Sequence, residues 1–389
     1  MSFADDIPKP ATGGTETSAR TEYDGHAGFL QTGALAGPPA SFTELLRQFG
    51  YDPNEVQIVG HPRISRWQSY GGEWLEAYRF HIAPRLADIT DETIGRWRDS
   101  LIVNPAPAAS VGQGGTYLIA IADPQLGKKG TSEAVDNWKR GVAAHLTAAR
   151  ALHEAFPLEG AHVAFMGDET ENVCNSYGNQ PHTIELNRSA QLELDFDLRV
   201  WTLKEAARLG VPLSVSSVIS NHGEWTRNGS KEPVTSQGDN ASTHIARQVK
   251  KLFDELADHG AMPRVTWHIG GGDPAVTLPL SGVDCYFSHG YIEKGKGGSS
   301  EIRTRNAIER QILGRTEELG KTSLFVTAHY HHFYSQEFEG RTLFGCPALE
   351  AERSSEYMLN QFGVWSPPGM LGMLVGLNHD RGWSNLNVF

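Results

Sequence analysis

The sequence predicts an α/β protein, and three observations carry that prediction. In residues 116–389, short apolar runs alternate with longer helical patterns, which is typical of α/β domains. The apolar runs contain few polar residues, as expected for strands that are covered on both faces. Polar side chains directly follow five of these runs, at the place where open α/β sheets build their binding sites. We therefore expect a buried sheet with a functional site at its carboxyl edge.

The first 105 residues predict a tail and a small α/β domain. Residues 1–40 are rich in Gly, Thr, Ala and Pro and lack periodicity, so we expect a flexible tail. In residues 41–105, Ser41 and Glu44 have the spacing of a capping box that opens a helix over Phe42–Phe49. The runs "VQIVG" and "WLEAYRFHI" predict two strands after it.

The aromatic-rich segment "SRWQSYGGEW" between these strands has two interpretations. In the first, its tryptophans form the core of the small domain, as the usual burial of aromatic side chains suggests. In the second, Arg63, Arg66, Trp67 and Tyr70 form a contact patch for nucleic acid or another partner. The sequence leaves both interpretations open.

Residues 106–115 lie in a Pro-, Ala- and Gly-rich linker, after which a large domain spans residues 116–389. We expect strands at Tyr117–Ala122, His162–Met166, Leu213–Ile219, Val265–His268, Asp284–Ser288 and Leu324–Thr327. We expect helices near Glu133–Phe156, Glu185–Leu209, Ser242–His259 and Ile302–Leu319. The C-terminal runs "HHFYSQEFEGRTLFGCPAL" and "GMLVGLNHD" predict hairpin-like strands.

Composition limits the classes of function. Hydrophobic residues make up 39% and charged residues 21% of the 389 residues, an ordinary composition for a soluble protein. The net charge of -12 provides no global basic field for nucleic acid, although a metal site supplies positive charge locally. The three cysteines are few and widely spaced, which favours reduced thiols over a disulfide framework. With no apolar run of membrane-spanning length and no secretory signal, we expect a cytoplasmic protein without a membrane partner.

Five predicted strand ends carry side chains that bind metals. In chain order these side chains are Asp123, Asp168, the pair Asn221 and His222, His289, and the pair His329 and His331. One aspartate at a strand end would mean little, because sixteen histidines and many acidic residues are spread over the chain. Packing alone does not account for the ordered set, so it predicts a metal centre.

The motifs "DPQ", "GDETE", "SNHGE", "SHG" and "AHYH" give this set a recognisable order. The sequence from about residue 116 to 350 resembles the calcineurin-like metallophosphoesterase superfamily, and is similar to its double-strand-break repair nuclease branch, including phage-encoded relatives. The resemblance implies a β-sandwich of two mixed sheets flanked by helices. It also implies two divalent metal ions, with Mn²⁺ favoured and Mg²⁺, Fe²⁺ and Zn²⁺ as alternatives.

The resemblance implies a ligand set for each metal. One metal would be bound by Asp123, Gln125, Asp168 and His331, and the other by Asp168, Asn221, His289 and His329, with Asp168 bridging the two. Gln125 stands where the family has a histidine. Its side-chain oxygen is a neutral donor, so we expect it to be a weak ligand or to hold a metal-bound water.

His222 has an expected role beside the metals. The resemblance implies that it gives a proton to the leaving oxygen or stabilises charge on the phosphate. Glu224, or alternatively Glu171, would orient its ring.

Two long loops are candidates for substrate binding. Residues 225–242 carry Arg227 and Lys231, and residues 291–305 carry Lys294 and Lys296. Their positive charge suits a phosphate backbone, and the alternative is that both are ordinary solvated loops.

Three functions follow. The first is a metal-dependent phosphodiesterase or nuclease with nucleic acid as its substrate, and the resemblance favours DNA. The second is a small-molecule phosphomonoesterase or cyclic-nucleotide phosphodiesterase, which the Asp-Pro-Gln motif favours. The third is a binding protein with a structural metal site, and His222 argues against it because a structural site does not need that side chain. The oligomeric state is open, with a homodimer as one alternative.

Overall fold

The computed structural model describes residues 18–25, 28–69, 71–84, 114–174, 176–178, 180–225, 235–291, 298–351, 358–360, 363 and 365–389. The chain divides into two compact units, Met1–Asp88 and Ile89–Phe389, and each is described by itself. Within the described residues, no helix is both long enough and apolar enough to cross a membrane.

Among its described residues, the small unit contains a four-stranded antiparallel sheet and one helix. The strands are β1 (Arg20–Tyr23), β2 (Gly28–Gln31), β3 (Val56–Gln68) and β4 (Trp74–Pro84), in the order β1-β2-β4-β3, and the helix is α1 (Phe42–Gln48). The Ser41 hydroxyl accepts a hydrogen bond from the backbone N–H of Glu44 at 3.3 Å, which caps the helix as expected.

Two expectations for the small unit are wrong. Strands β1 and β2 lie within the segment expected to be a tail, because two four-residue strands give little periodic signal in a Gly- and Thr-rich stretch. Among the described residues, the buried core consists of Leu30, Leu45, Leu46, Val56, Tyr78, Phe80 and Ile82, with no tryptophan among them. Trp67 and Trp74 lie beside the turn of the β3–β4 hairpin, and Trp74 is 56% exposed.

The large unit is built on two mixed sheets. The six-stranded sheet has the order β15-β14-β5-β6-β7-β8, and the five-stranded sheet has the order β12-β13-β11-β10-β9. The strands are β5 (Thr116–Ile121), β6 (Gly160–Phe165), β7 (Leu213–Ser217), β8 (Val265–Ile269), β9 (Ala275–Leu280), β10 (Val283–Ser288), β11 (Leu324–Thr327), β12 (Tyr334–Phe338), β13 (Arg341–Gly345), β14 (Leu371–Val375) and β15 (Trp383–Val388).

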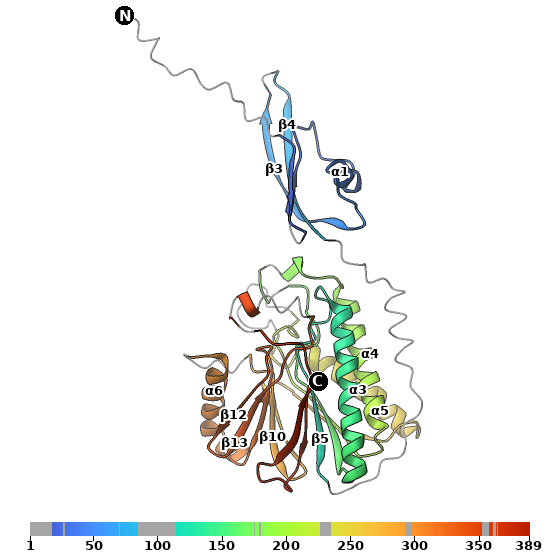
Figure 1. Cartoon of the computed structure of the whole chain (residues 1–389), viewed down its shortest axis with the longest axis vertical. Coiled ribbons are helices and arrows are strands. Elements are labelled where there is room, and N and C mark those ends of the chain that lie inside the picture. The colour runs from blue at the N-terminus through green and yellow to red at the C-terminus, as the bar shows by residue number, and fades with distance from the viewer. Residues whose placement is uncertain are drawn as a thin grey trace, which may run out of the picture. The chain divides into compact units, whose positions relative to one another are not determined.

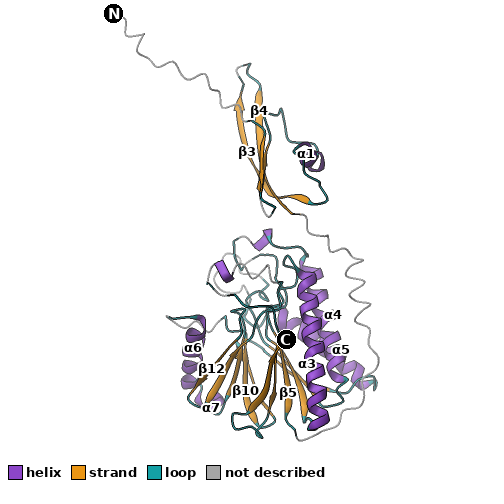
Figure 2. Cartoon of the chain, viewed as in Figure 1, coloured by secondary structure: helices purple, strands orange, loops and turns teal. Residues whose placement is uncertain are grey.

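Helices cover the outer faces of both sheets. They are α3 (Thr131–Ala155), α4 (Arg188–Ala207), α5 (Ala241–Asp258), α6 (Ser300–Gly314) and α7 (Thr316–Leu319), with the short 3-10 helix η1 (Gln180–His182). Helices α3, α4 and α5 lie on one side of the pair of sheets and α6 on the other (Figure 1). The layers, coloured by type in Figure 2, confirm the predicted sandwich of two mixed sheets flanked by helices.

Alternate residues of β5 show how the layers pack. Tyr117, Ile119 and Ile121 join the core under the helices, which includes Trp138 of α3. Leu118 and Ala120 point the other way and join the core between the two sheets, with Cys285 and Phe287 of β10. Both faces of β5 are therefore buried, which explains its continuous apolar sequence.

The six strands predicted for this unit are present, with ends shifted by at most two residues. Strand β9 was not predicted because Pro279 argues against a strand, but β9 is at the edge of its sheet, where proline is tolerated. The helix expected over Ile302–Leu319 is interrupted at Arg315, whose φ of -130° separates α6 from α7.

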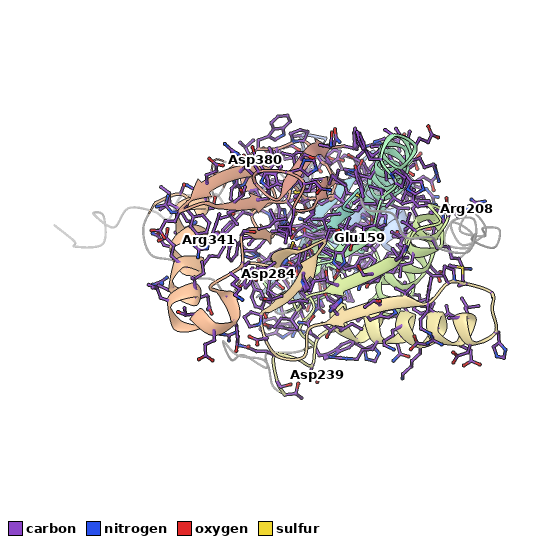
Figure 3. All side chains as sticks on the ribbon, turned by 90° about the horizontal axis from the view of Figure 1, so that it is seen from below. Glu159, Arg208, Asp239, Asp284, Arg341 and Asp380 are labelled. Atoms are coloured by element: carbon purple, nitrogen blue, oxygen red, sulfur yellow. The ribbon has the colours of Figure 1, made fainter. Side chains whose placement is uncertain are left out.

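The parallel strands bring their carboxyl ends to one edge. Strands β5, β6 and β7 are parallel neighbours, and so are β10 and β11. Glu159, Asp284 and Arg341, labelled in Figure 3, are at the amino-terminal ends of β6, β10 and β13. The loops with the metal-type side chains follow the opposite ends of these strands.

Candidate metal centre

The backbone after the strands turns sharply at the candidate ligands. Asp123, Gln125, Asp168, His329 and His331 all have left-handed φ values, between 45° and 73°. Such values are uncommon for residues other than glycine, and they gather at sites where the surrounding structure imposes them.

Gly167 shows how closely these turns approach one another. A Cβ atom at this position would lie 2.6 Å from the Cβ of Ser220 and 2.9 Å from Nδ1 of His289. Only glycine fits between these loops, so its place before Asp168 has a steric reason.

The first group of candidate ligands surrounds His289. Donor atoms of Asp168, His289 and His329 all lie within 4.8 Å of one another. The Nε2 atom of His289 is 3.0 Å from Oδ2 of Asp168 and 3.0 Å from Oδ1 of Asn221. Four residues from four strand ends therefore present nitrogen or oxygen atoms to one small volume.

The second group adjoins the first. The Nε2 atom of His331 is 3.3 Å from Oδ1 of Asp123, and the same oxygen is 4.0 Å from Nε2 of His289. Oδ1 of Asp123 is buried and has no hydrogen-bond partner among the described residues. A buried carboxylate oxygen without a donor is costly, and a cation at this place would satisfy it.

The outer nitrogen of each ring fixes its orientation. Nδ1 of His289 lies 2.8 Å from the backbone oxygen of Met166, and Nδ1 of His331 lies 2.6 Å from Oε1 of Glu350. Both oxygens accept, so each Nδ1 carries a proton and each Nε2 faces the centre, where the neutral ring would offer its lone pair to a cation. This is the arrangement of metal-binding histidines.

The pKa values reflect strong negative charge at the centre. Burial lowers the pKa of His331, but the carboxylates of Glu350 and Asp123 outweigh it and raise the pKa to about 10. Burial likewise lowers the pKa of His289, and Asp168 and Asp123 reverse the shift. Burial and the neighbouring His289 lower the pKa of His329 to about 3, so this ring is neutral. The two aspartates thus favour positive charge here, which suits a cation and neutral imidazole ligands.

His222 lies beside the centre with its ring held by Glu171. Its backbone N–H donates to Oδ1 of Asp168 at 2.9 Å, and its Nε2 is 3.9 Å from Oδ2 of the same residue. Its Nδ1 is 2.9 Å from the backbone oxygen and 3.0 Å from carboxylate Oε2 of Glu171. Burial lowers the pKa of His222, but Glu171 and Asp168 raise it to about 9. A ring of this kind can hold a proton next to the centre.

Of the two partners that the sequence allows for His222, the structure places Glu171 on the ring. Tyr177 donates to Oε1 of Glu171 at 2.5 Å, and Gln180 donates to its backbone oxygen at 2.6 Å. The backbone oxygen of Glu224 accepts a hydrogen bond from Asn172 at 2.7 Å. Glu224 also forms an isolated antiparallel β-bridge with Asn240.

Lys128 and Glu350 were not predicted. Lys128 Nζ lies 2.6 Å from Oε2 of Glu350, and the other oxygen of that carboxylate bonds His331. Glu350 stands five residues after β13, the neighbour of β11 in the sheet, and an acidic residue after a further strand end was the available signal. Lys128 stands in the loop after the first motif and had no signal of its own.

The four predicted substrate-binding residues Arg227, Lys231, Lys294 and Lys296 lie outside the described residues. The guanidinium of Arg303 lies 5.9 Å from the ring centroid of Tyr330, and that centroid is 5.2 Å from the ring centroid of His329. A cationic side chain is therefore described close to the candidate ligands.

Comparisons with known proteins give only distant similarity. No family model matches the chain, and no curated protein matches it. Among solved structures, a Zn²⁺ complex of Vps29 from Entamoeba histolytica is 15% identical with a TM-score of 0.19, covering 32% of this chain and 63% of that one. The alignment thus spans less than two thirds of that Vps29 chain.

Two further structures align over more of this chain. An archaeal phosphodiesterase is 8% identical with a TM-score of 0.29, covering 70% of this chain and 99% of that one. The phosphopantetheinyl hydrolase of Mycobacterium tuberculosis is 11% identical with a TM-score of 0.26, covering 65% and 95%. At these values the function must be argued from the geometry of the chain itself.

Proposed function

We propose that the protein is a metal-dependent phosphoester hydrolase of the calcineurin-like metallophosphoesterase type. The observation that carries this proposal is the convergence of Asp123, Asp168, Asn221, His289, His329 and His331 from five strand ends around an unpartnered carboxylate oxygen. The fold and the order of the motifs agree with the family that the sequence resembles.

The donor set fits two divalent cations. Asp168, Asn221, His289 and His329 would hold one, and Asp123, Asp168 and His331 would hold the other, with Asp168 shared. Mixed oxygen and nitrogen donors suit Mn²⁺, and Mg²⁺, Fe²⁺ and Zn²⁺ remain alternatives. When bound, such a pair of ions activates water and neutralises charge on a phosphoryl group.

His222 supplies the proton in this proposal. In this role Nδ1 of His222 is committed to Glu171, at 2.9 Å from its backbone oxygen and 3.0 Å from its carboxylate. Nε2 is then the atom that gives its proton to the leaving oxygen, as a general acid. A purely structural metal site would have no use for this ring and its carboxylate partner.

A phosphodiester of nucleic acid, DNA in particular, is the favoured substrate, and the repair-nuclease branch is the favoured relative. Arg303 provides positive charge beside Tyr330, and the hairpin of the small unit carries Arg66 with its guanidinium 5.1 Å from the Trp74 ring centroid. Exposed arginine and tryptophan side chains are typical of surfaces that bind single strands. The alternative is a small-molecule phosphomonoesterase or cyclic-nucleotide phosphodiesterase, which the Asp-Pro-Gln motif favours.

One parallel assay tests the proposal. Purified protein with Mn²⁺, and in parallel with Mg²⁺, Fe²⁺ or Zn²⁺, is given bis-p-nitrophenyl phosphate, p-nitrophenyl phosphate, and labelled single- and double-stranded DNA, with His222→Ala as the matched control. We expect hydrolysis of the diester and of DNA, at a rate that the variant lowers strongly. Hydrolysis of the monoester alone would support the alternative function, and no hydrolysis of any substrate with any of the four metals would overturn both.

A further inference from the structure

We infer that Gln125 is not a metal ligand but a hydrogen-bond donor to a phosphoryl oxygen of the substrate, held in that orientation by Lys128. The inference rests on the proposed function, because it concerns the same site. It differs from the role of the histidine that Gln125 replaces, since the side chain would bind the anion and not the cation.

Lys128 determines which end of the Gln125 amide faces the centre. Its Nζ lies 2.9 Å from Oε1 of Gln125. A lysine ammonium has only donors, so the atom that it contacts must be the amide oxygen. Turning the amide over would put its NH₂ group against the ammonium, two donors facing each other. The oxygen is therefore committed to Lys128, and the amide nitrogen faces Nε2 of His331 at 3.4 Å.

Lys128 is itself fixed in place. Its Nζ also donates to Oε2 of Glu350 at 2.6 Å, and its side chain is only 13% exposed. Glu350 is buried, bonds His331 through its other oxygen, and its backbone N–H donates to the backbone oxygen of Asp123 at 3.1 Å. Gln125 is thus oriented by a buried ion pair.

The backbone conformation and the burial of Gln125 restrict how its side chain can approach the centre. The residue is 4% exposed, its φ is 45°, and its backbone N–H donates to the backbone oxygen of Asp168 at 3.0 Å. An amide nitrogen has no lone pair for a metal, but it is a good donor to an anionic oxygen. Next to His331 and Asp123, the oxygen that it meets is one of the substrate's phosphoryl oxygens.

Metal titration separates the two roles. Mn²⁺ binding to the purified protein, followed by calorimetry and by elemental analysis, is compared for the wild type, Gln125→Ala, Gln125→His and His331→Ala. We expect Gln125→Ala to change the Mn²⁺ affinity of each metal position by no more than about twofold. The loss of one hydrogen bond to a charged group would change it by more than that. His331→Ala should lose one of the two ions, and Gln125→His should gain affinity for Zn²⁺ because imidazole suits zinc. A tenfold loss of Mn²⁺ affinity in Gln125→Ala would overturn the inference.

A double-mutant cycle tests Lys128 as a positioning residue. Lys128→Met releases the amide oxygen, which can then turn toward the metal, but removing a positive charge also tightens cation binding. In a Gln125→Ala background there is no amide oxygen to turn, so Lys128→Met changes Mn²⁺ affinity only through the lost positive charge. We expect Lys128→Met to tighten Mn²⁺ binding about fivefold more in the wild-type background than in the Gln125→Ala background, a ratio that corresponds to one hydrogen bond. Equal tightening in both backgrounds would show that Lys128 does not orient Gln125.

Lys128→Arg is the control variant for folding defects in the double-mutant cycle. It keeps the charge and the donors, so its Mn²⁺ affinity should equal that of the wild type, and the melting temperature of each variant reports whether it folds. If Lys128→Met does not fold, Gln125→Glu takes its place, because a carboxylate has no donor for phosphate and can bind metal. We expect tighter Mn²⁺ binding and weaker phosphate binding in that variant, and the opposite pair of results would contradict the inference.

Phosphate binding completes the test. Inorganic phosphate is titrated into the Mn²⁺-loaded wild type and Gln125→Ala, and we expect about 10–150-fold weaker binding in the variant, the range for one hydrogen bond to a charged group. Unchanged phosphate affinity would overturn the inference. Metal and phosphate binding are measured without turnover. The absence of phosphoester hydrolysis would therefore contradict only the proposed function. A protein that hydrolyses diesters but loses metal in Gln125→Ala would sink only the inference.

Discussion

His289 belongs to the first group of candidate ligands and His331 to the second, and the two rings are oriented by different hydrogen-bond acceptors. His289 donates its Nδ1 proton to a backbone oxygen, that of Met166, whereas His331 donates to the carboxylate of Glu350, which also binds Lys128. A backbone carbonyl cannot be changed by substitution and carries no net charge. A buried carboxylate adds charge and can be tuned by its own partners. The comparison teaches that one half of the centre is set by the fold and the other half by side chains.

The largest effect is expected where the two halves meet. Asp168 contacts His289 and, through its backbone oxygen, Gln125. We expect Asp168→Asn to weaken both Mn²⁺ positions and to lower activity by more than the ~10²–10⁴-fold that is the usual contribution of a general acid. Calorimetric titration and the diester assay measure it. Loss of only one ion would mean that Asp168 is not shared.

A smaller effect is expected for the proton donor, which belongs to neither half. We expect His222→Ala to bind Mn²⁺ as the wild type does and to lose ~10²–10⁴-fold in turnover, the usual contribution of general acid–base catalysis. Glu171→Gln is the companion variant, because it removes a charge that raises the pKa of the ring. Metal loss in His222→Ala would make His222 a ligand and contradict its assigned role.

The comparison itself is sharpened by Glu350→Gln. The amide keeps only one of the two oxygens, so either His331 or Lys128 would face its NH₂ group, a donor, in place of an acceptor. We expect the His331 position to lose ~10–100-fold in Mn²⁺ affinity while the His289 position is unchanged. Elemental analysis after dialysis at limiting Mn²⁺ counts the retained ions. Equal weakening of both positions would show that the halves are not independent.

The smallest effect concerns a histidine with neutral hydrogen-bond partners. His162 is fully buried between the hydroxyls of Ser214 and Ser216, at 2.7 and 2.9 Å, and burial lowers its pKa to about 3. The unfolded chain therefore binds the proton first, and stability is lost as the pH falls from about 6.5 toward 3. We expect His162→Gln to reduce the slope of unfolding free energy by up to ~1.4 kcal/mol per pH unit in that window. Urea unfolding between pH ~4 and ~7 measures it, and an unchanged slope would contradict the prediction.

Much of this arrangement could be predicted from the sequence, and the exceptions have physical reasons. Buried parallel strands and the polar residues after them follow from local patterns, so the positions of Asp123, Asp168 and His289 at one edge were foreseeable. The orientation of a side chain depends on atoms far away in the chain, as Lys128 and Glu350 show for Gln125. Strand β9 was not predicted: it contains Pro279, which disfavours a strand except at places such as a sheet edge, and edges are set by the whole fold.

The residues with left-handed φ values at the centre have a consequence for the abundance of the protein in the cell. Each such residue raises the free energy of the folded chain by ~1–3 kcal/mol, and five of them gather here. Under the proposed function, ions that bind only the folded chain offset this by mass action, in proportion to the logarithm of their free concentration. The fraction of chains that is folded, and so spared by proteases, would then follow the metal content of the compartment. Metal starvation would reduce the abundance of the protein as well as its activity.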